Sequence, residues 1–173
     1  MGENLDITIT TEQIKNLREE SGGGIMDCRN ALKEANGDKA KALELLQKQG
    51  FIKAQKSAGR VAKQGLIVSY IHGGGRIGAL IEVNCETDFV ARTAEFQEMC
   101  HNVAMQVAAM DPQYLSKNEC PTGVEIDFQN ACLLMQPYIK DPGKTIQDVV
   151  AELISKTGEN IIIARFQRFE VGK

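Results

Sequence analysis

The sequence predicts an α+β fold in which a small three-helix bundle precedes an antiparallel sheet packed with helices. Three observations lead to this prediction. Apolar residues recur at helical spacing through residues 10–50, the period changes to two after residue 65, and the chain closes on a β-branched and aromatic run at 160–171. A chain of 173 residues with 43% hydrophobic content is also large enough to pack an ordinary core.

Residues 10–50 are expected to form three short helices. The first begins at Thr10 or Thr11, and Gln13 is placed to complete a capping box there. The second and third helices each carry a stripe of apolar side chains at helical spacing. These stripes consist of Cys28, Ala31, Leu32 and Ala35 in the second helix and of Ala42, Leu43, Leu45 and Leu46 in the third.

The third helix is expected to end where a basic linker begins. Asp38 can cap its start, and Gly50 is placed to close it as a left-handed C-cap. Residues 52–64 then carry four positive charges and no acid, which is typical of a solvated, partly helical connection. A phosphate or ribosome contact is the alternative for this segment. We therefore expect a bundle over residues 1–51, this linker, and an α+β core over residues 65–173.

A β-hairpin is expected over residues 65–83. Its two strands flank a histidine and three glycines at 72–75, a sequence that favours a turn. A phosphate-binding loop is disfavoured at this position, because a phosphate cradle needs its glycines between a strand and the N-terminus of a helix.

Two further helices are expected after the hairpin. A long helix begins at Thr87 or Asp88 and continues to residue 110. Residues 112–144 contain all four prolines and are expected to be mostly irregular. Thr145 then caps a second, strongly amphipathic helix before the closing strand.

The cysteines are interpreted as free thiols. Their odd number and the absence of a CxxC pair argue against a disulfide framework. A zinc site would need Cys100 and His101, but adjacent residues on a helix point in different directions. We therefore expect no metal or other cofactor. An enzyme with Cys28, Cys85 or Cys100 as nucleophile is disfavoured as well, because no base is positioned for it.

Charge and hydropathy exclude two classes of partner. The formal net charge is -3 and the chain has no Trp, whereas nucleic-acid binding calls for a basic patch with interleaved aromatic residues. No apolar run approaches the roughly 20 residues that span a bilayer. The first four residues also lack the basic start of a signal peptide. We expect a cytoplasmic protein without direct nucleic-acid or membrane contacts.

Three stretches together resemble the elongation factor Ts family. Residues 17–38 read LREESGGGIMDCRNALKEANGD and resemble the N-terminal signature of that family. Residues 83–91 read VNCETDFVA and resemble its second signature. Residues 158–171, from Gly-Glu-Asn-Ile to Arg-Phe-Glu-Val, resemble its closing strand. The resemblance covers about 80% of the chain, in the order of the family.

This resemblance implies a fold and a function. The implied fold is a three-helix bundle of the ubiquitin-associated type, a basic linker and an antiparallel sheet with helices. The implied function is guanine-nucleotide exchange on elongation factor Tu, which releases GDP during translation elongation without covalent chemistry. Longer family members carry a second copy of the core, for which this chain is too short. The resemblance therefore implies a short form that is a homodimer through residues 65–173.

The resemblance also implies which residues touch the GTPase. Phe89 matches the residue that inserts between helices of the GTPase, and its neighbours Thr87, Asp88 and Val90 belong to the same motif. Periodicity alone favours a different role for Phe89. It falls in a seven-residue repeat of apolar positions that is typical of a buried helix face: Phe89, Phe96, Val103 and Met110.

Further contacts are implied for the bundle and for the hairpin. Arg18, Ile25 and Met26 match positions that grip the nucleotide-binding domain of the GTPase, although Ile25 and Met26 could equally be helix-packing residues. His72 matches a position near the partner, with a polar turn residue as the alternative. An adaptor that binds ubiquitin-like or peptide ligands through residues 12–50 is the rival function, and it leaves residues 87–90 unexplained.

Overall fold

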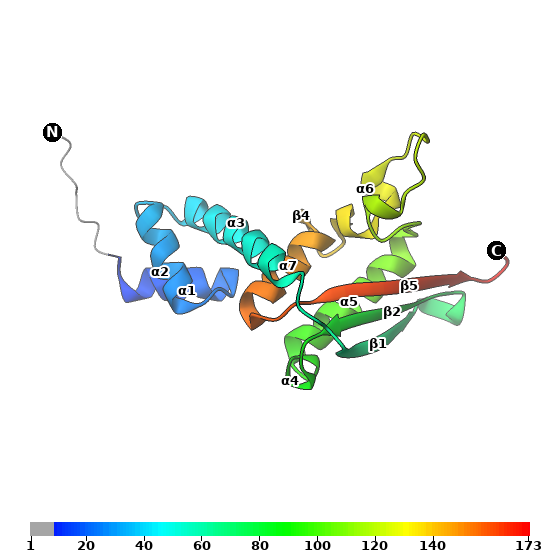
Figure 1. The fold of residues 1–173 in the computed structure, drawn as a ribbon, viewed down its shortest axis with the longest axis horizontal. Helices are drawn as coiled ribbons and strands as arrows, with labels where there is room; N and C mark the ends of the chain where they lie inside the picture. Colours follow the sequence, from blue (N-terminus) through cyan, green and yellow to red (C-terminus); the bar gives the residue numbers. More distant parts are fainter. Residues whose placement is uncertain (1–8) are drawn as a thin grey trace.

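The computed structural model describes residues 9–173, which form a helical bundle followed by an α+β core (Figure 1). Residues 1–8 of the predicted bundle lie outside the described residues. The α+β fold class is confirmed. Within residues 9–173, no helix is both long enough and apolar enough to cross a membrane.

The bundle contains the three expected helices, α1 (Thr11–Ser21), α2 (Ile25–Glu34) and α3 (Lys39–Ser57). The capping box at the start of α1 is confirmed: Gln13 N donates to Thr10 Oγ1 at 3.2 Å, and Thr10 N donates to Gln13 Oε1 at 2.9 Å. A small core of buried side chains holds the helices together, and it consists of Leu17, Cys28, Ala31, Leu32, Ala35 and Ala42.

Helix α3 does not end at Gly50, so the predicted C-cap at that residue is wrong. The helix continues to Ser57 and takes up the first part of the expected linker. Gly50 is buried, and its neighbours across the helix contact are Ala151 and Ser155 of α7 (Ile146–Thr157). Figure 1 shows α3 and α7 side by side. A Cβ on Gly50 would lie 3.6 Å from the backbone oxygen of Ala151, an ordinary van der Waals distance, so the two helices are in contact here but leave room for a methyl group. Its role is packing and not helix termination.

A three-stranded antiparallel sheet forms one layer of the core. The expected hairpin is confirmed as β1 (Gln64–Ile71) and β2 (Ile77–Cys85), and the closing strand is confirmed as β5 (Ile162–Glu170). The strand order is β1-β2-β5, which places β2 at the centre and leaves the other two at the edges.

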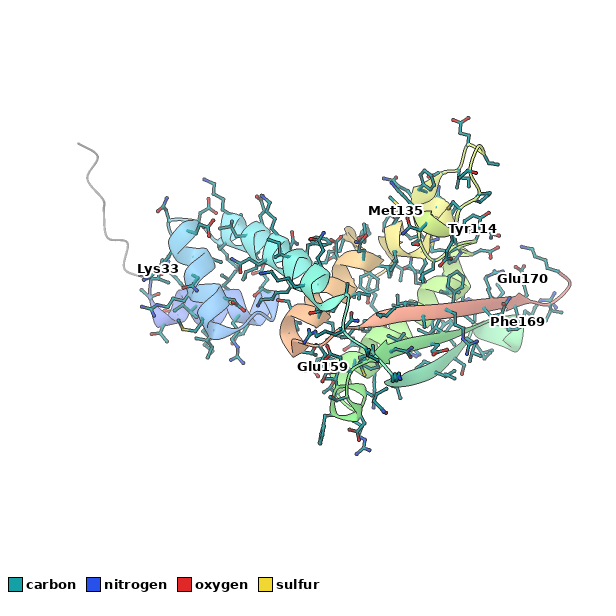
Figure 2. The ribbon with its side chains drawn as sticks, viewed as in Figure 1. Lys33, Tyr114, Met135, Glu159, Phe169 and Glu170 are labelled. Atoms are coloured by element: carbon teal, nitrogen blue, oxygen red, sulfur yellow. The ribbon has the colours of Figure 1, made fainter. Side chains whose placement is uncertain are left out.

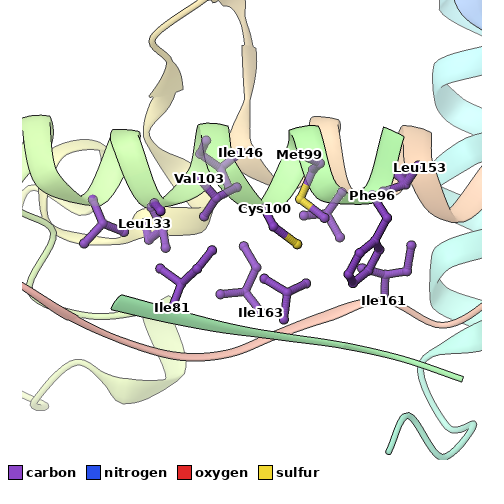
Figure 3. Close-up of a cluster of buried hydrophobic side chains, with 14 of the residues drawn as sticks. Ile81, Phe96, Met99, Cys100, Val103, Leu133, Ile146, Leu153, Ile161 and Ile163 are labelled. Atoms are coloured by element: carbon purple, nitrogen blue, oxygen red, sulfur yellow. The ribbon is translucent and has the colours of Figure 1, made fainter. Parts of the chain in front are cut away.

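Helices α5 (Ala94–Met110) and α7 cover one face of this sheet. Alternate residues of β2 point into the layer between sheet and helices, where the main core lies (Figure 3). The side chains labelled there include Ile81, Phe96, Cys100, Val103, Leu133, Ile146, Leu153, Ile161 and Ile163. The amphipathic helix capped by Thr145 is confirmed, with Asp148 completing a capping box.

The long helix expected from residue 87 to residue 110 is broken in two. A single turn, α4 (Asp88–Ala91), is followed by α5, and Thr93 separates them. The hydroxyl of Thr93 accepts a hydrogen bond from Phe96 N at 3.3 Å and caps the new helix. The spacing of apolar residues predicted one continuous helix because that spacing contains no information about the polar cap at Thr93.

Residues 112–144 are built of short pieces, as expected from their prolines. They contain short helical turns at Lys117–Glu119, α6 (Phe128–Ala131) and Leu133–Met135, followed by β3 (Pro137–Tyr138) and the start of β4 (Asp141–Thr145). A buried amide pair anchors this segment to α5. Gln106 Nε2 donates to Gln136 Oε1 at 3.2 Å, and Gln106 Oε1 accepts from Ile139 N at 2.8 Å.

Candidate functional site

Helix α4 projects Phe89 into solvent. The Phe89 side chain is 78% exposed, whereas Val90 is half-buried against the core and Ala91 is buried. The spacing of seven therefore does not describe one buried face, since Phe96 and Val103 are fully buried while Phe89 is not. The core alternative for Phe89 is wrong, because Phe89 is exposed on α4, and the helix that buries Phe96 and Val103 begins only at Ala94.

The residues around Phe89 hold the turn of α4 in place. Thr87 caps it, with its hydroxyl accepting a hydrogen bond from Val90 N at 3.4 Å. Asp88 forms an ion pair with Arg92 at 2.8 Å, in which the acid lies at the positive end of the helical turn. The predicted motif residues thus lie together, with one large apolar side chain at their outer surface.

Glu159, which no sequence pattern singled out, lies beside this motif (Figure 2). Its carboxylate accepts hydrogen bonds from Glu86 N and Thr87 N, each at 3.1 Å, and from the Thr87 hydroxyl at 2.6 Å. Glu159 stands in the Gly-Glu-Asn run of the closing motif, but that run alone does not reveal which segment the carboxylate binds.

The bundle presents a second candidate surface. Ile25 and Met26 are each 58% exposed at the first two positions of α2, and Arg18 is exposed in the last turn of α1. Both apolar side chains therefore lie outside the small core of the bundle. The alternative in which they pack between helices is wrong.

His72 is exposed at the turn of the hairpin, where Tyr70 Oη and His72 Nδ1 lie 3.2 Å apart. The hairpin register pairs Ile71 with Gly78 at this end and Gln64 with Cys85 at the other. Since α4 follows Cys85, His72 and Phe89 lie at opposite ends of an eight-residue strand, about 25 Å apart. The structure does not bring the two residues into one site.

The face of the sheet opposite the helices is a further candidate surface, which we call the open sheet face. Leu80 is 44% exposed at its centre, and the register places Ser69 and Gln167 on either side of it. The exposed apolar side chains of this face are Ile67, Ile71, Leu80, Ile162 and Phe169. Phe169 lies near the end of β5 that is remote from Glu159 (Figure 2). Alternation in the sequence predicted the strands but not which face would remain uncovered.

The cysteines are poorly suited to nucleophilic chemistry. Cys28, Cys85, Cys100 and Cys132 are buried, and all five thiols are free. Burial raises the pKa of Cys100 to about 12. The pKa of Cys85 is also raised, mainly by burial and to a lesser extent by the negative charge of Glu159. Among residues 9–173, no three His, Cys, Asp or Glu side chains are grouped so that they could hold a metal ion.

Comparison with known proteins identifies the family. A family model described as elongation factor TS matches residues 44–125. The elongation factor Ts of Moorella thermoacetica is 47% identical in an alignment that covers 95% of this chain and 96% of that protein. The elongation factor Ts of Thermotoga maritima is 47% identical in an alignment that covers 95% of this chain and 97% of that protein. The chain therefore belongs to the elongation factor Ts family.

Proposed function

We propose that Phe89 is the side chain through which this chain acts on its GTPase. As an elongation factor Ts, the chain is a guanine-nucleotide exchange factor for elongation factor Tu in translation elongation and makes or breaks no covalent bond. The observation that supports Phe89 is its position: a large apolar side chain is 78% exposed on a turn whose other residues are anchored. An anchored, protruding aromatic residue is suited to entering a pocket of a partner.

Exchange requires only that the factor bind the nucleotide-free GTPase more tightly than the GDP-bound form. Weakening GDP binding by about 10⁴-fold takes about 5.5 kcal/mol of differential contact. A Phe that becomes buried only when the nucleotide pocket is deformed contributes to this difference. We propose that Thr87, Asp88 and Val90 contribute by fixing the turn that carries it.

The bundle provides the second contact in this proposal. Ile25 and Met26 form an exposed apolar pair at the start of α2, and the cationic Arg18 is exposed in the last turn of α1; both kinds of side chain are suited to contacting a protein surface. We place His72 at a separate, peripheral contact, because it lies at the far end of the hairpin from α4. The GTPase would then be held at the bundle and deformed at Phe89.

We further propose that the chain is a homodimer through the open sheet face. An antiparallel sheet that leaves one face to water normally shows polar side chains there. Among its polar residues this face exposes five large apolar side chains on three strands, and an exposed apolar surface of that kind marks an interaction site. A second copy of the same face offers the same apolar surface, as a two-fold interface requires.

The compartment is part of the same proposal. Translation elongation and five free thiols both favour the cytoplasm. The net charge of -3 gives no support for direct nucleic-acid binding, and we propose no membrane contact.

The experiment that tests the proposed function is stopped-flow release of a fluorescent GDP analogue from elongation factor Tu. We expect the wild-type chain to accelerate release and Phe89→Ala to lower the maximal rate by about tenfold or more, the loss of one buried aromatic contact. Val124→Ala is the matched control, because Val124 is 60% exposed on the distant loop before α6. If the wild-type protein did not accelerate GDP release at saturation, the exchange function would be contradicted. If Phe89→Ala and Val124→Ala gave equal rates, Phe89 would not be the side chain that acts on the GTPase.

A further inference from the structure

Glu159 and Glu86 each bind the backbone of the other's segment, across the junction between the end of β2 and the start of β5. Glu159 Oε2 accepts hydrogen bonds from Glu86 N and Thr87 N, each at 3.1 Å. In the other direction, Glu86 Oε1 accepts a hydrogen bond from Asn160 N. Hydrogen bonds from backbone N–H groups to a carboxylate are charge-assisted and stronger than neutral ones. The two segments are therefore fastened in both directions.

This junction is connected directly to α4. The Thr87 hydroxyl donates its one hydrogen to Glu159 Oε1 at 2.6 Å, which leaves its lone pairs to accept from Val90 N at 3.4 Å. Thr87 also accepts a hydrogen bond from Ala91 N through its backbone oxygen, at 3.3 Å. The carboxylate of Glu159 thus orients the cap of the turn that carries Phe89.

Arg60 joins the end of the bundle to the same junction. Its Nε lies 3.2 Å from Glu86 Oε1, and its guanidinium donates to the backbone oxygen of Gly158 at 2.7 Å. The backbone oxygen of Arg60 accepts from Asn160 Nδ2 at 2.7 Å, and Asn160 is only 2% exposed. The segment after α3, the end of β2 and the start of β5 therefore meet at one polar cluster, in which Asn160 is buried and Arg60 is exposed.

We propose that Glu159 is a positioning residue that holds α4 in the orientation in which Phe89 is presented to the GTPase. The expected effect of Glu159 on nucleotide exchange rests on the proposed function. Its structural part, that Glu159 restrains α4, can be tested on the free protein. Glu159 does not itself touch the partner in this proposal, so its loss acts through Phe89.

Hydrogen exchange of the free protein, followed by mass spectrometry, is the first test. Glu159→Gln keeps the shape of the side chain but replaces one acceptor oxygen with an NH₂ group that faces N–H and O–H donors. We expect the amides of residues 86–92 to exchange about tenfold faster, while those of β1 keep their wild-type rates. Unchanged protection of residues 86–92 would overturn the proposal.

Glu152→Gln is the matched control for this substitution. Glu152 lies on α7, its carboxylate is also paired, with Lys144 at 2.7 Å, and it makes no hydrogen bond to the α4 segment. We expect this variant to leave the amide hydrogen-exchange rates of residues 86–92 unchanged. The same acceleration in both variants would mean a general loosening of the core and would also overturn a specific role for Glu159.

The second test measures GDP release from elongation factor Tu over a range of factor concentrations. We expect Glu159→Gln to lower the maximal rate about tenfold and to leave the half-saturating concentration within about twofold, because the bundle surface remains intact. A wild-type maximal rate, or a loss confined to the half-saturating concentration, would overturn the proposal. If the wild-type protein itself fails to accelerate release, the proposed function fails, and hydrogen exchange still decides whether Glu159 holds α4.

Discussion

At the scale of single residues, Phe89 and Phe96 differ in solvent exposure although their spacing predicts the same helix face. The two side chains are seven positions apart, yet the first is 78% exposed and the second fully buried. A helical repeat predicts a common face only while the helix is continuous, and Thr93 ends that continuity. The family resemblance identified Phe89 as the candidate contact, whereas periodicity alone predicted the opposite environment.

Substitution of these two residues should therefore have opposite effects on stability. Phe96→Ala removes a fully buried ring and is expected to lower the free energy of unfolding by about 3–5 kcal/mol. Phe89→Ala removes an exposed ring and should change it by less than about 0.5 kcal/mol. Urea unfolding followed by circular dichroism measures both. Similar losses for the two variants would mean that Phe89 is packed in the free protein.

The thiols should differ in reactivity in the native state. Cys120 is half-buried, whereas the other four cysteines are buried, and burial keeps Cys100 protonated at pH 8 because its pKa is about 12. We expect Ellman's reagent at pH 8 to modify about one thiol quickly and the rest only after denaturant is added. Cys120→Ser should remove the fast phase. A fast phase that persists in that variant would assign the reactivity to another thiol.

At the scale of elements, two helix starts marked by local capping residues were predicted correctly, whereas the end of α3 was not. The capping boxes at Thr10 and Thr145 are local in sequence, and both were predicted to begin helices where the structure has them. Gly50 was predicted to end α3 because a glycine after an apolar stripe usually does so. Instead Gly50 lies in the contact with α7, where its neighbour Ala151 is 101 residues away in sequence, and no local pattern contains that information.

Substitutions at Gly50 test this packing role. A Cβ there would meet Ala151 O at 3.6 Å, an ordinary van der Waals distance, so Gly50→Ala should be accommodated. Because alanine favours the helix interior, this variant is expected to raise the free energy of unfolding by about 0.5–1 kcal/mol. Gly50→Leu should lower it, since the larger side chain forces α3 away from α7. Urea unfolding measures both changes. If Gly50→Ala lowered the free energy of unfolding, the inference that a methyl group fits at this contact would be wrong.

At the scale of the whole molecule, the sequence predicted the fold class and the order of its parts, because each part has its own periodicity. It could not predict how the candidate surfaces are distributed. The bundle pair Ile25 and Met26, the α4 turn and the hairpin turn lie on separate elements, and the strand register sets the last two at opposite ends of β1. A partner that contacts several of them must be large, which fits a GTPase better than a short peptide.

The open sheet face leads to the prediction for the assembly. One face of the sheet is covered by α5 and α7, and the other has no covering element within residues 9–173. The polar members of this open face include Glu82 and Arg165, which neutralise each other in an ion pair at 2.7 Å. The charges on the face therefore do not oppose its association with a second copy.

We accordingly expect the free protein to be a dimer at micromolar concentration, with about twice the 19.0 kDa mass of one chain by light scattering. Leu80→Lys places a charge at the centre of the open sheet face and should yield monomers with unchanged circular dichroism, because Leu80 is 44% exposed in the single chain. Ile52→Lys is the control, since Ile52 is 50% exposed on α3, away from the sheet, and should leave the mass unchanged. A wild-type mass of one chain at every concentration would exclude the dimer, and a dimer that survives Leu80→Lys would place its interface elsewhere.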